Sequence, residues 1–201
     1  MLDFMTIATK HTKEGTEVFP KFKMQKSKDL MIRAKDFYAI WDESRQLWST
    51  DEDDAVHIID AELDRYVQEH DARITGYPTI KYMWDADSGS IDKFHKYCQK
   101  QMRDNFHSLD TELVFSNSDM SRETYASKRL PYPLEKGNYD AFDKLIGTLY
   151  SEEERHKIEW AIGSIVSGDS KHIQKFMVLY GAAGTGKSTV LNIVQELFDG
   201  Y

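Results

Sequence analysis

Residues 175–198, KFMVLYGAAGTGKSTVLNIVQELF, contain the pattern that decides how the fold of this chain is interpreted. The apolar run over residues 175–180 predicts a short buried strand. Residues 181–188 follow with a glycine, four residues and Gly-Lys-Ser, and apolar side chains recur at helical spacing from residue 190 onward. Strand, glycine-rich loop and helix in this order predict a P-loop.

The residue types of this loop suit a nucleoside triphosphate. Gly181, Gly184 and Gly186 lack a Cβ, so the backbone can curl and point successive N–H groups at phosphate oxygens. The helix that begins near Lys187 adds the positive end of its dipole. Lys187 supplies a point charge for the β- and γ-phosphates, and the hydroxyl of Ser188 is placed to bind Mg²⁺.

We therefore expect ATP and Mg²⁺ as cofactors, Lys187 as the catalytic residue and Ser188 as the metal ligand. The predicted nucleotide-binding residues are Gly181, Ala182, Ala183, Gly184, Thr185, Gly186, Lys187, Ser188 and Thr189.

Two helices are expected ahead of the loop. Apolar residues over 142–149 have the spacing of a short amphipathic helix. Ser151 and Glu154 have the spacing of a capping box, and Gly168 is placed to end the helix that they begin. Prolines and a glycine mark a linker near residues 116–138, which divides the chain into an accessory domain, residues 1–130, and a P-loop domain, residues 131–201.

The accessory domain is expected to be mostly helical. Residues 1–35 are polar and rich in lysine, which predicts an exposed lead-in with one short element at most. Two aromatic runs within residues 37–49 predict a β-hairpin. Thr50 and the acids after it then have the composition of a helix N-terminus, and Ser90 is a candidate cap for a second helix over residues 91–107.

The second predicted helix separates its side chains into two arcs. At 100° per residue, one arc is apolar and contains Ile91, Phe94, Cys98, Met102 and Phe106. The opposite arc is cationic and contains Lys93, Lys96, Lys100 and Arg103. These four cations could contact the phosphates of single-stranded DNA, although a solvated helix face explains them more simply.

The composition limits the classes of function. Lys and Arg number 26 against 34 Asp and Glu, so DNA binding would need a local basic patch. No apolar run approaches the length of a membrane span, and the N-terminus lacks a signal-peptide core, so no membrane association is expected. The single cysteine, Cys98, excludes an intrachain disulfide and fits a reducing cytoplasm.

Other candidate sites have simpler structural explanations. The aromatic side chains of the predicted hairpin are Phe37, Tyr38, Trp41 and Trp48. Their rings could stack on bases, but we expect them to pack together as a small core. His95 and Cys98 could reach one zinc ion, but no second ligand pair has suitable spacing. The acids over residues 51–54 are expected to cap a helix. Trp160 is expected to pack, with adenine recognition as the alternative.

The region before and through the P-loop resembles the helicase region of bacteriophage and poxvirus-type primase-helicases, which are superfamily 3 motors of the AAA+ type. The resemblance is carried by Leu130–Leu134, by Glu-Trp-Ala-Ile-Gly at Glu159–Gly163 and by Gly-Asp-Ser-Lys at Gly168–Lys171. Residues 28–56 look like the aromatic hairpin and helix that begin the family's accessory domain. The resemblance spans about residues 25 to 201.

This resemblance implies ATP-driven unwinding of single-stranded or forked DNA by a ring, usually a hexamer, encoded by a phage and located in the cytoplasm of a bacterial host. The implied fold is α/β, with an accessory domain followed by the start of a P-loop ATPase domain. The family's site residues carry over only to the Walker A loop, where Lys187 would hold the phosphates, Ser188 the magnesium and the amides of residues 183–187 the β-phosphate.

In the family, the Walker B acids, the sensor and the arginine finger lie downstream of Walker A. This chain ends at Tyr201, so we expect the front portion of a helicase, inactive by itself, with apolar surface exposed at Val178, Ile193 and Leu197. The alternatives are a nucleotide or small-molecule kinase, or a non-catalytic module that loads or binds a helicase ring.

Overall fold

The computed structural model describes residues 2–23, 26–34, 37–70, 76–85, 89–101 and 107–201. Its fold is α/β, and the chain forms two compact units. Unit 1 consists of Met1–Leu109 with Met120–Ser127, and unit 2 of Asp110–Asp119 with Lys128–Tyr201. Within the described ranges, no helix is both long and apolar enough to cross a bilayer.

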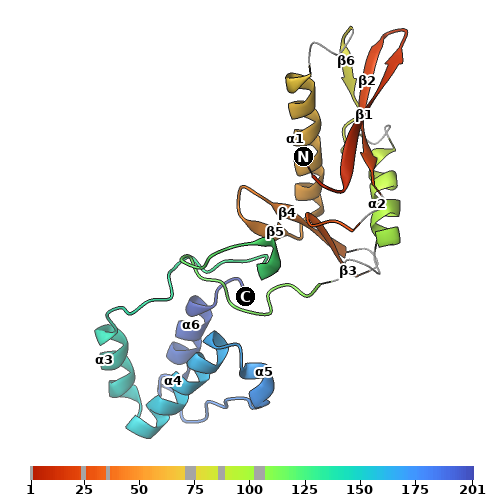
Figure 1. Ribbon diagram of the computed structural model, residues 1–201. Helices are drawn as coiled ribbons and strands as arrows, with labels where there is room; N and C mark the ends of the chain where they lie inside the picture. Colours follow the sequence, from red (N-terminus) through yellow and green to blue (C-terminus); the bar gives the residue numbers. More distant parts are fainter. Residues whose placement is uncertain (1, 24–25, 35–36, 71–75, 86–88, 102–106) are drawn as a thin grey trace. The chain divides into compact units, whose positions relative to one another are not determined.

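The first sheet of unit 1 has the strand order β1-β2-β6 (Figure 1). Strands β1 (Met5–Thr12) and β2 (Gly15–Phe22) form an antiparallel hairpin. Strand β6 (Pro78–Ile80) pairs in parallel with the beginning of β2. Alternate residues of β2 are buried, so the hairpin turns one of its faces to the core.

The prediction of an exposed lead-in over residues 1–35 is wrong. This stretch forms β1, β2 and β3 (Leu30–Ala34), and it buries Phe4 and Val18 completely. The alternation was hidden because one buried position of β2 holds a polar residue, Thr16, while exposed lysines dominate the composition. Unit 1 is therefore α/β, and the expectation of a mostly helical accessory domain is also wrong.

The second sheet contains the aromatic hairpin predicted over residues 37–49, which is confirmed. Its strand order is β3-β4-β5, with β4 at Phe37–Asp42 and β5 at Leu47–Ser49, and both pairings are antiparallel. Trp41 and Trp48 lie opposite each other, with ring centroids 5.7 Å apart. Such aromatic cross-strand pairs stabilise a hairpin whose turn lacks a strong turn dipeptide.

The rings of this hairpin lie inside unit 1. Tyr38, Trp41 and Trp48 are all buried, which confirms the interpretation as a small core. Buried rings offer no free face on which a base could stack. The side chain of Phe37 lies outside the described residues.

Helix α1 spans Glu52–Glu69, and its N-cap is Asp51 rather than Thr50. The carboxylate of Asp51 accepts a hydrogen bond of 2.9 Å from the amide of Asp53. Asp54 accepts from Ser49 Oγ at 2.6 Å and pairs with Arg45. These contacts confirm that the acids over residues 51–54 serve the helix N-terminus.

Helix α2 spans Ser90–Gln101, with Ser90 as its first residue rather than its cap. Its apolar arc is confirmed where it is described, because Phe94 and Cys98 are buried and Ile91 is half-buried against the same core. Lys93, Lys96 and Lys100 are exposed on the opposite side. The remaining residues assigned to the two arcs, Met102, Arg103 and Phe106, lie outside the described residues.

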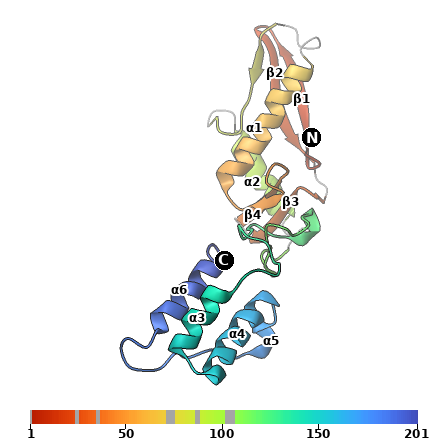
Figure 2. The same ribbon diagram turned by 90° about the vertical axis from the view of Figure 1, so that its left-hand side faces the viewer.

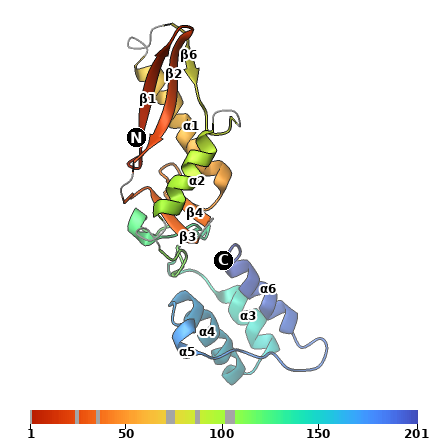
Figure 3. The ribbon, with the colours of Figure 1, turned by 90° about the vertical axis from the view of Figure 1, so that its right-hand side faces the viewer.

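Both helices pack on the first sheet and contribute to one core. Helix α1 contacts β2, β4 and β6, and α2 contacts β2 (Figure 3). The fully buried members of this core include Phe4 and Val18 from the hairpin region and Ile59 and Leu63 from α1. Burial of these side chains is the main source of stability for unit 1.

A segment within the predicted linker, residues 120–127, is part of unit 1. It contains the short helix η3 (Arg122–Thr124). The amide of Trp48 donates to the carbonyl of Ala126, and its indole N–H donates to the carbonyl of Arg122, both at 2.9 Å. The Arg122 guanidinium lies 5.2 Å from the Trp41 ring centroid and pairs with Asp29 at 2.8 Å. These contacts close one side of the tryptophan pair.

Unit 2 is built from helices (Figure 2). These are α3 (Asp140–Leu149), α4 (Glu152–Val166), α5 (Ser170–Ile173) and α6 (Lys187–Leu197). The core between α3, α4 and α6 is centred on the buried side chains of Ile146, Ile158 and Val190. Each of these three helices thus supplies one apolar stripe to a common core.

The ends of α4 match the sequence prediction. Ser151 Oγ accepts from the amide of Glu154 at 3.4 Å, and Glu154 Oε2 accepts from the amide of Ser151 at 2.9 Å, which is the capping box. At the other end, Gly168 has φ +75° and its amide donates to the carbonyl of Ile165 at 3.1 Å. A glycine in the left-handed conformation ends the helix here.

The prediction of a buried strand over residues 175–180 is wrong. The segment has no strand pairing, and Phe176, Val178 and Tyr180 are 88%, 69% and 98% exposed. A strand requires a neighbour for its backbone hydrogen bonds, and unit 2 contains no other strand among its described residues. The expected exposure of Val178 is confirmed, whereas Ile193 and Leu197 are half-buried.

The burial of Val18 in β2 yields the first prediction. Val18→Ala should lower the free energy of unfolding by about 2 kcal/mol, because it removes two buried methyl groups and leaves a cavity. Lys10→Ala, at an exposed position of β1, is the control and should change stability by less than about 0.5 kcal/mol. Urea denaturation of the purified chain measures both. Equal changes in the free energy of unfolding for the two variants would show that Val18 is exposed, as the sequence analysis predicted for residues 1–35.

Candidate nucleotide-binding site

The predicted loop and helix are both present in unit 2. Residues 181–186 connect the extended segment 175–180 to α6, and Gly186 is the N-cap of that helix with φ +79°. Gly184 has φ +81°. Both values lie in the left-handed region, where a side chain would strain the backbone.

Gly186 also lies against the last turn of α3. A Cβ at this position would be 2.8 Å from Cδ1 of Leu149, whereas a Cβ at Gly184 would meet no atom within 4 Å. The absence of a side chain at residue 186 therefore serves both the backbone conformation and the close packing of the loop on α3.

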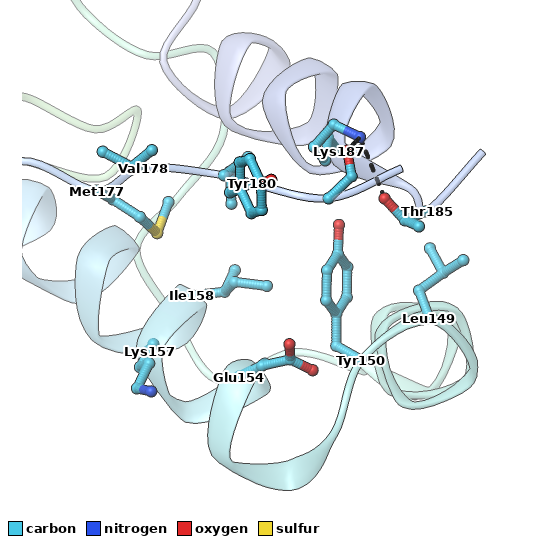
Figure 4. Close-up of a pocket in the computed structure, with 12 residues that line it drawn as sticks. Leu149, Tyr150, Glu154, Lys157, Ile158, Met177, Val178, Tyr180, Thr185 and Lys187 are labelled. Atoms are coloured by element: carbon cyan, nitrogen blue, oxygen red, sulfur yellow. Dashed lines mark hydrogen bonds between the residues drawn. The ribbon is translucent and has the colours of Figure 1, made fainter. Parts of the chain in front are cut away.

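The ammonium group of Lys187 is folded back into the loop (Figure 4). Its Nζ donates to the carbonyl oxygens of Gly181 at 2.9 Å and Ala182 at 2.6 Å, and to Oγ1 of Thr185 at 3.2 Å. Thr185 Oγ1 donates in turn to the carbonyl of Ala182 at 2.9 Å. A lysine ammonium has three N–H donors, so the loop occupies all of them and closes around the charge.

The amides at the turn of the loop remain available. In the part of the chain that the structure describes, the backbone N–H groups of residues 183–186 donate no hydrogen bond. Helix α6 has no acidic residue in its first turn to offset the positive end of its dipole. Open amides, a helix N-terminus and a lysine ammonium are the groups with which proteins commonly bind anions such as phosphate.

The other predicted loop residues do not all lie at this site. Ala182 and Ala183 are exposed in the loop, and Ser188 is exposed in the first turn of α6. Thr189 instead lines a separate hollow with Tyr132 and Glu196. The structure thus brings residues 181–188 together and places Thr189 on a different side of α6.

Ser188 is the predicted protein ligand of Mg²⁺. The described residues contain no group of three or more His, Cys, Asp or Glu side chains that could hold a metal ion. Mg²⁺ commonly keeps several waters and binds the phosphates of its nucleotide, so a single hydroxyl fits its needs.

A pocket of about 310 Å³ lies between the loop and the junction of α3 with α4 (Figure 4). The loop contributes Gly181, Thr185 and Lys187 to its lining. The junction and α4 contribute Leu149, Tyr150, Glu154, Lys157 and Ile158, and the segment before the loop contributes Met177, Val178, Leu179 and Tyr180. Its size and mixed lining suit a small ligand.

Tyr150 and Glu154 are pocket residues that the sequence analysis did not assign to a ligand site. Glu154 was interpreted only as half of the capping box, and no spacing rule connects either residue to the loop. Trp160, the residue weighed for adenine recognition, does not line this pocket. It is 53% exposed and borders a second hollow with Phe176, so the expectation that it packs in the core is wrong.

The two remaining candidates lie in unit 1. Burial raises the pKa of the Cys98 thiol to about 12, so it stays protonated at neutral pH and is a poor zinc ligand, and neighbouring His95 is exposed. Lys93, Lys96 and Lys100 form an exposed cationic face on α2, which we call the lysine face. Arg103, its fourth predicted member, lies outside the described residues.

The contact between Gly186 and Leu149 yields a second prediction. Gly186→Ala should destabilise unit 2 more than Gly184→Ala, because both substitutions strain a left-handed residue, by about 1–3 kcal/mol, but only the first also meets a side chain. In a double-mutant cycle, Leu149→Ala should relieve part of the cost of Gly186→Ala. Urea denaturation measures each variant. Additive effects would show that the loop does not lie against Leu149.

Comparison with family models, curated proteins and solved structures found no match to this chain.

Proposed function

We propose that this chain binds ATP with Mg²⁺ through residues 181–188 and is the ATP-binding portion of a phage-type replicative DNA helicase. The observation that carries the proposal is the loop closed around the Lys187 ammonium at the N-terminus of α6. The complete motor would act in the cytoplasm of a bacterial host as a ring on single-stranded or forked DNA.

The chemistry of the loop supports a polyphosphate ligand. Phosphate oxygens accept from the open amides of residues 183–186 and lie at the positive end of α6. To reach them, Lys187 must exchange at least one of its present acceptors for a phosphate oxygen. The exchange is favourable because a charged phosphate oxygen accepts a stronger hydrogen bond than a neutral carbonyl does.

Helix α4 supports a helicase over a kinase. The residues that resemble superfamily 3 helicases, Glu159–Gly163, lie in α4, and Gly168–Lys171 follow directly where α4 ends. Helix α4 packs in one core with α6, so these residues belong to the same body as the phosphate loop. A kinase remains the alternative enzyme class, and phosphate transfer to a nucleotide acceptor would distinguish it. A ring-binding or loader module is the non-enzymatic alternative.

We also propose that these 201 residues alone hold ATP without hydrolysing it at a motor's rate. Among the described residues that line the pocket, Glu154 is the one carboxylate, and its Oε2 is occupied by Ser151. No arginine lines that pocket in the described part of the chain. Phosphoryl transfer needs a group that orients the attacking water and a cation that stabilises the developing charge.

Lys187→Ala provides the third prediction. It should weaken the binding of a ribose-labelled fluorescent ATP analogue with Mg²⁺ by about 10- to 150-fold, because a charged hydrogen bond contributes about 1.5–3 kcal/mol. Lys144→Ala, which removes an exposed lysine of α3, is the matched control and should bind normally. Equal affinity of the wild type and Lys187→Ala would overturn the nucleotide site.

The lysine face of α2 supports a second, separate contact with DNA. Lys93, Lys96 and Lys100 are all exposed, as phosphate contacts require. We predict that any affinity for a single-stranded oligonucleotide falls with salt at a log–log slope of about −2, as three phosphate contacts imply. Changing all three lysines to glutamine should abolish that slope in a fluorescence-anisotropy titration. Unchanged binding by the triple variant would rule this face out.

A further inference from the structure

The hydroxyl of Tyr150 is buried and has no hydrogen-bond partner among the described residues. The residue is held firmly, because it is the C-cap of α3 and its amide donates to the carbonyl of Ile146 at 2.9 Å. Its ring packs against the core of α3, α4 and α6. Buried hydroxyls normally find a partner, so an unpaired one among the residues that line a ligand-sized pocket points to a hydrogen bond with a ligand.

The position of the hydroxyl identifies the space that such a ligand would fill. Figure 4 shows the ring of Tyr150 standing in the pocket with its hydroxyl directed toward the loop side, where Thr185 and Lys187 lie. The carboxylate of Glu154 lies on the opposite side, below the same space. The pocket therefore has a cationic end at the loop and an acceptor end at α4, where Lys157, the other charged lining residue, is paired with Glu153 at 2.7 Å.

The acceptor end is a poor place for phosphate. Both capping bonds of Glu154, from the amide and the hydroxyl of Ser151, end on Oε2. The same bonds lower the pKa of Glu154, so the carboxylate is ionised at neutral pH and its Oε1 can accept from a ligand N–H. A negative charge repels phosphate but binds an amino group.

The walls between the two ends are apolar. Leu149, Ile158, Met177 and Val178 line them. A flat heteroaromatic base has apolar faces for such walls and polar edges for the few polar groups. A ribose, which has hydroxyl groups on most of its surface, fits this lining less well.

We propose that Tyr150 and Glu154 recognise the adenine base of the nucleotide whose phosphates lie in the loop. In this arrangement the Tyr150 hydroxyl donates to a ring nitrogen, and Glu154 accepts from the exocyclic amino group. The assignment rests on the proposed nucleotide site and extends it by naming the residues that select the base. Hypoxanthine, which has a carbonyl oxygen in place of the amino group, would be rejected by the Glu154 carboxylate.

The test compares Tyr150→Phe with the wild type by competition against the ribose-labelled ATP analogue. ATP should bind about three- to tenfold more weakly to Tyr150→Phe, as expected for the loss of one hydrogen bond, while inorganic tripolyphosphate should compete equally well. The thermal midpoint of the free variant should stay the same or rise, because the change removes an unpaired buried hydroxyl. Tyr139→Phe, at an exposed position, is the matched control.

Glu154→Gln is the second variant. Glutamine also completes a capping box, so α4 keeps its N-terminus. Its amide can donate to a carbonyl, so the preference for ATP over ITP should shrink relative to the wild type, whereas Glu152→Gln in the same turn should leave the preference unchanged.

The outcomes separate the two proposals. If tripolyphosphate and ATP both bind but Tyr150→Phe and Glu154→Gln leave ATP affinity and the ATP/ITP ratio unchanged, base recognition by these residues is overturned and the phosphate site stands. A preference for GTP or ITP over ATP in the wild type overturns the adenine assignment in the same way. If neither tripolyphosphate nor ATP binds, both proposals fall.

Discussion

The loop of residues 181–186 lies directly against the last turn of α3, and only a residue without a side chain at position 186 permits this approach. A Cβ there would lie 2.8 Å from Leu149 Cδ1. The same approach brings Tyr150 and Glu154, which follow Leu149 in sequence, to the pocket that Lys187 also lines. The contact at Gly186 thus sets how closely the loop approaches the α3–α4 junction, which the core of Ile146, Ile158 and Val190 holds against α6.

The exposed loop has a defined shape because its own lysine organises it. The Lys187 ammonium donates hydrogen bonds to the carbonyls of Gly181 and Ala182 and to the hydroxyl of Thr185. The charge is therefore already hydrogen-bonded within the loop. The free energy of binding a phosphate is then a difference between two sets of hydrogen bonds, and the internal set lowers the affinity for weak acceptors. Under the proposed function, such a loop would bind strongly charged oxygens in preference to neutral ones.

Sequence patterns predicted the elements whose stabilising contacts are local, such as the capping box of Ser151 and Glu154 and the start of α6 after residues 181–186. They failed where the partner is distant. Residues 175–180 have the composition of a strand but no neighbour to pair with, and the burial of Val18 depends on helices far along the chain. The place of Tyr150 in the pocket could not be predicted for the same reason, because its relation to the loop exists only in three dimensions.

Unit 1 is not continuous in sequence. The chain enters unit 2 at residues 110–119 and then returns to unit 1 for residues 120–127. That segment supplies the Ala126 carbonyl for the amide of Trp48 and the Arg122 guanidinium that covers Trp41. A fragment that stops at Leu109 would therefore leave the tryptophan pair partly uncovered. Residues 120–127 must therefore return to unit 1 before its tryptophan pair is fully covered, although the residues just before them belong to unit 2.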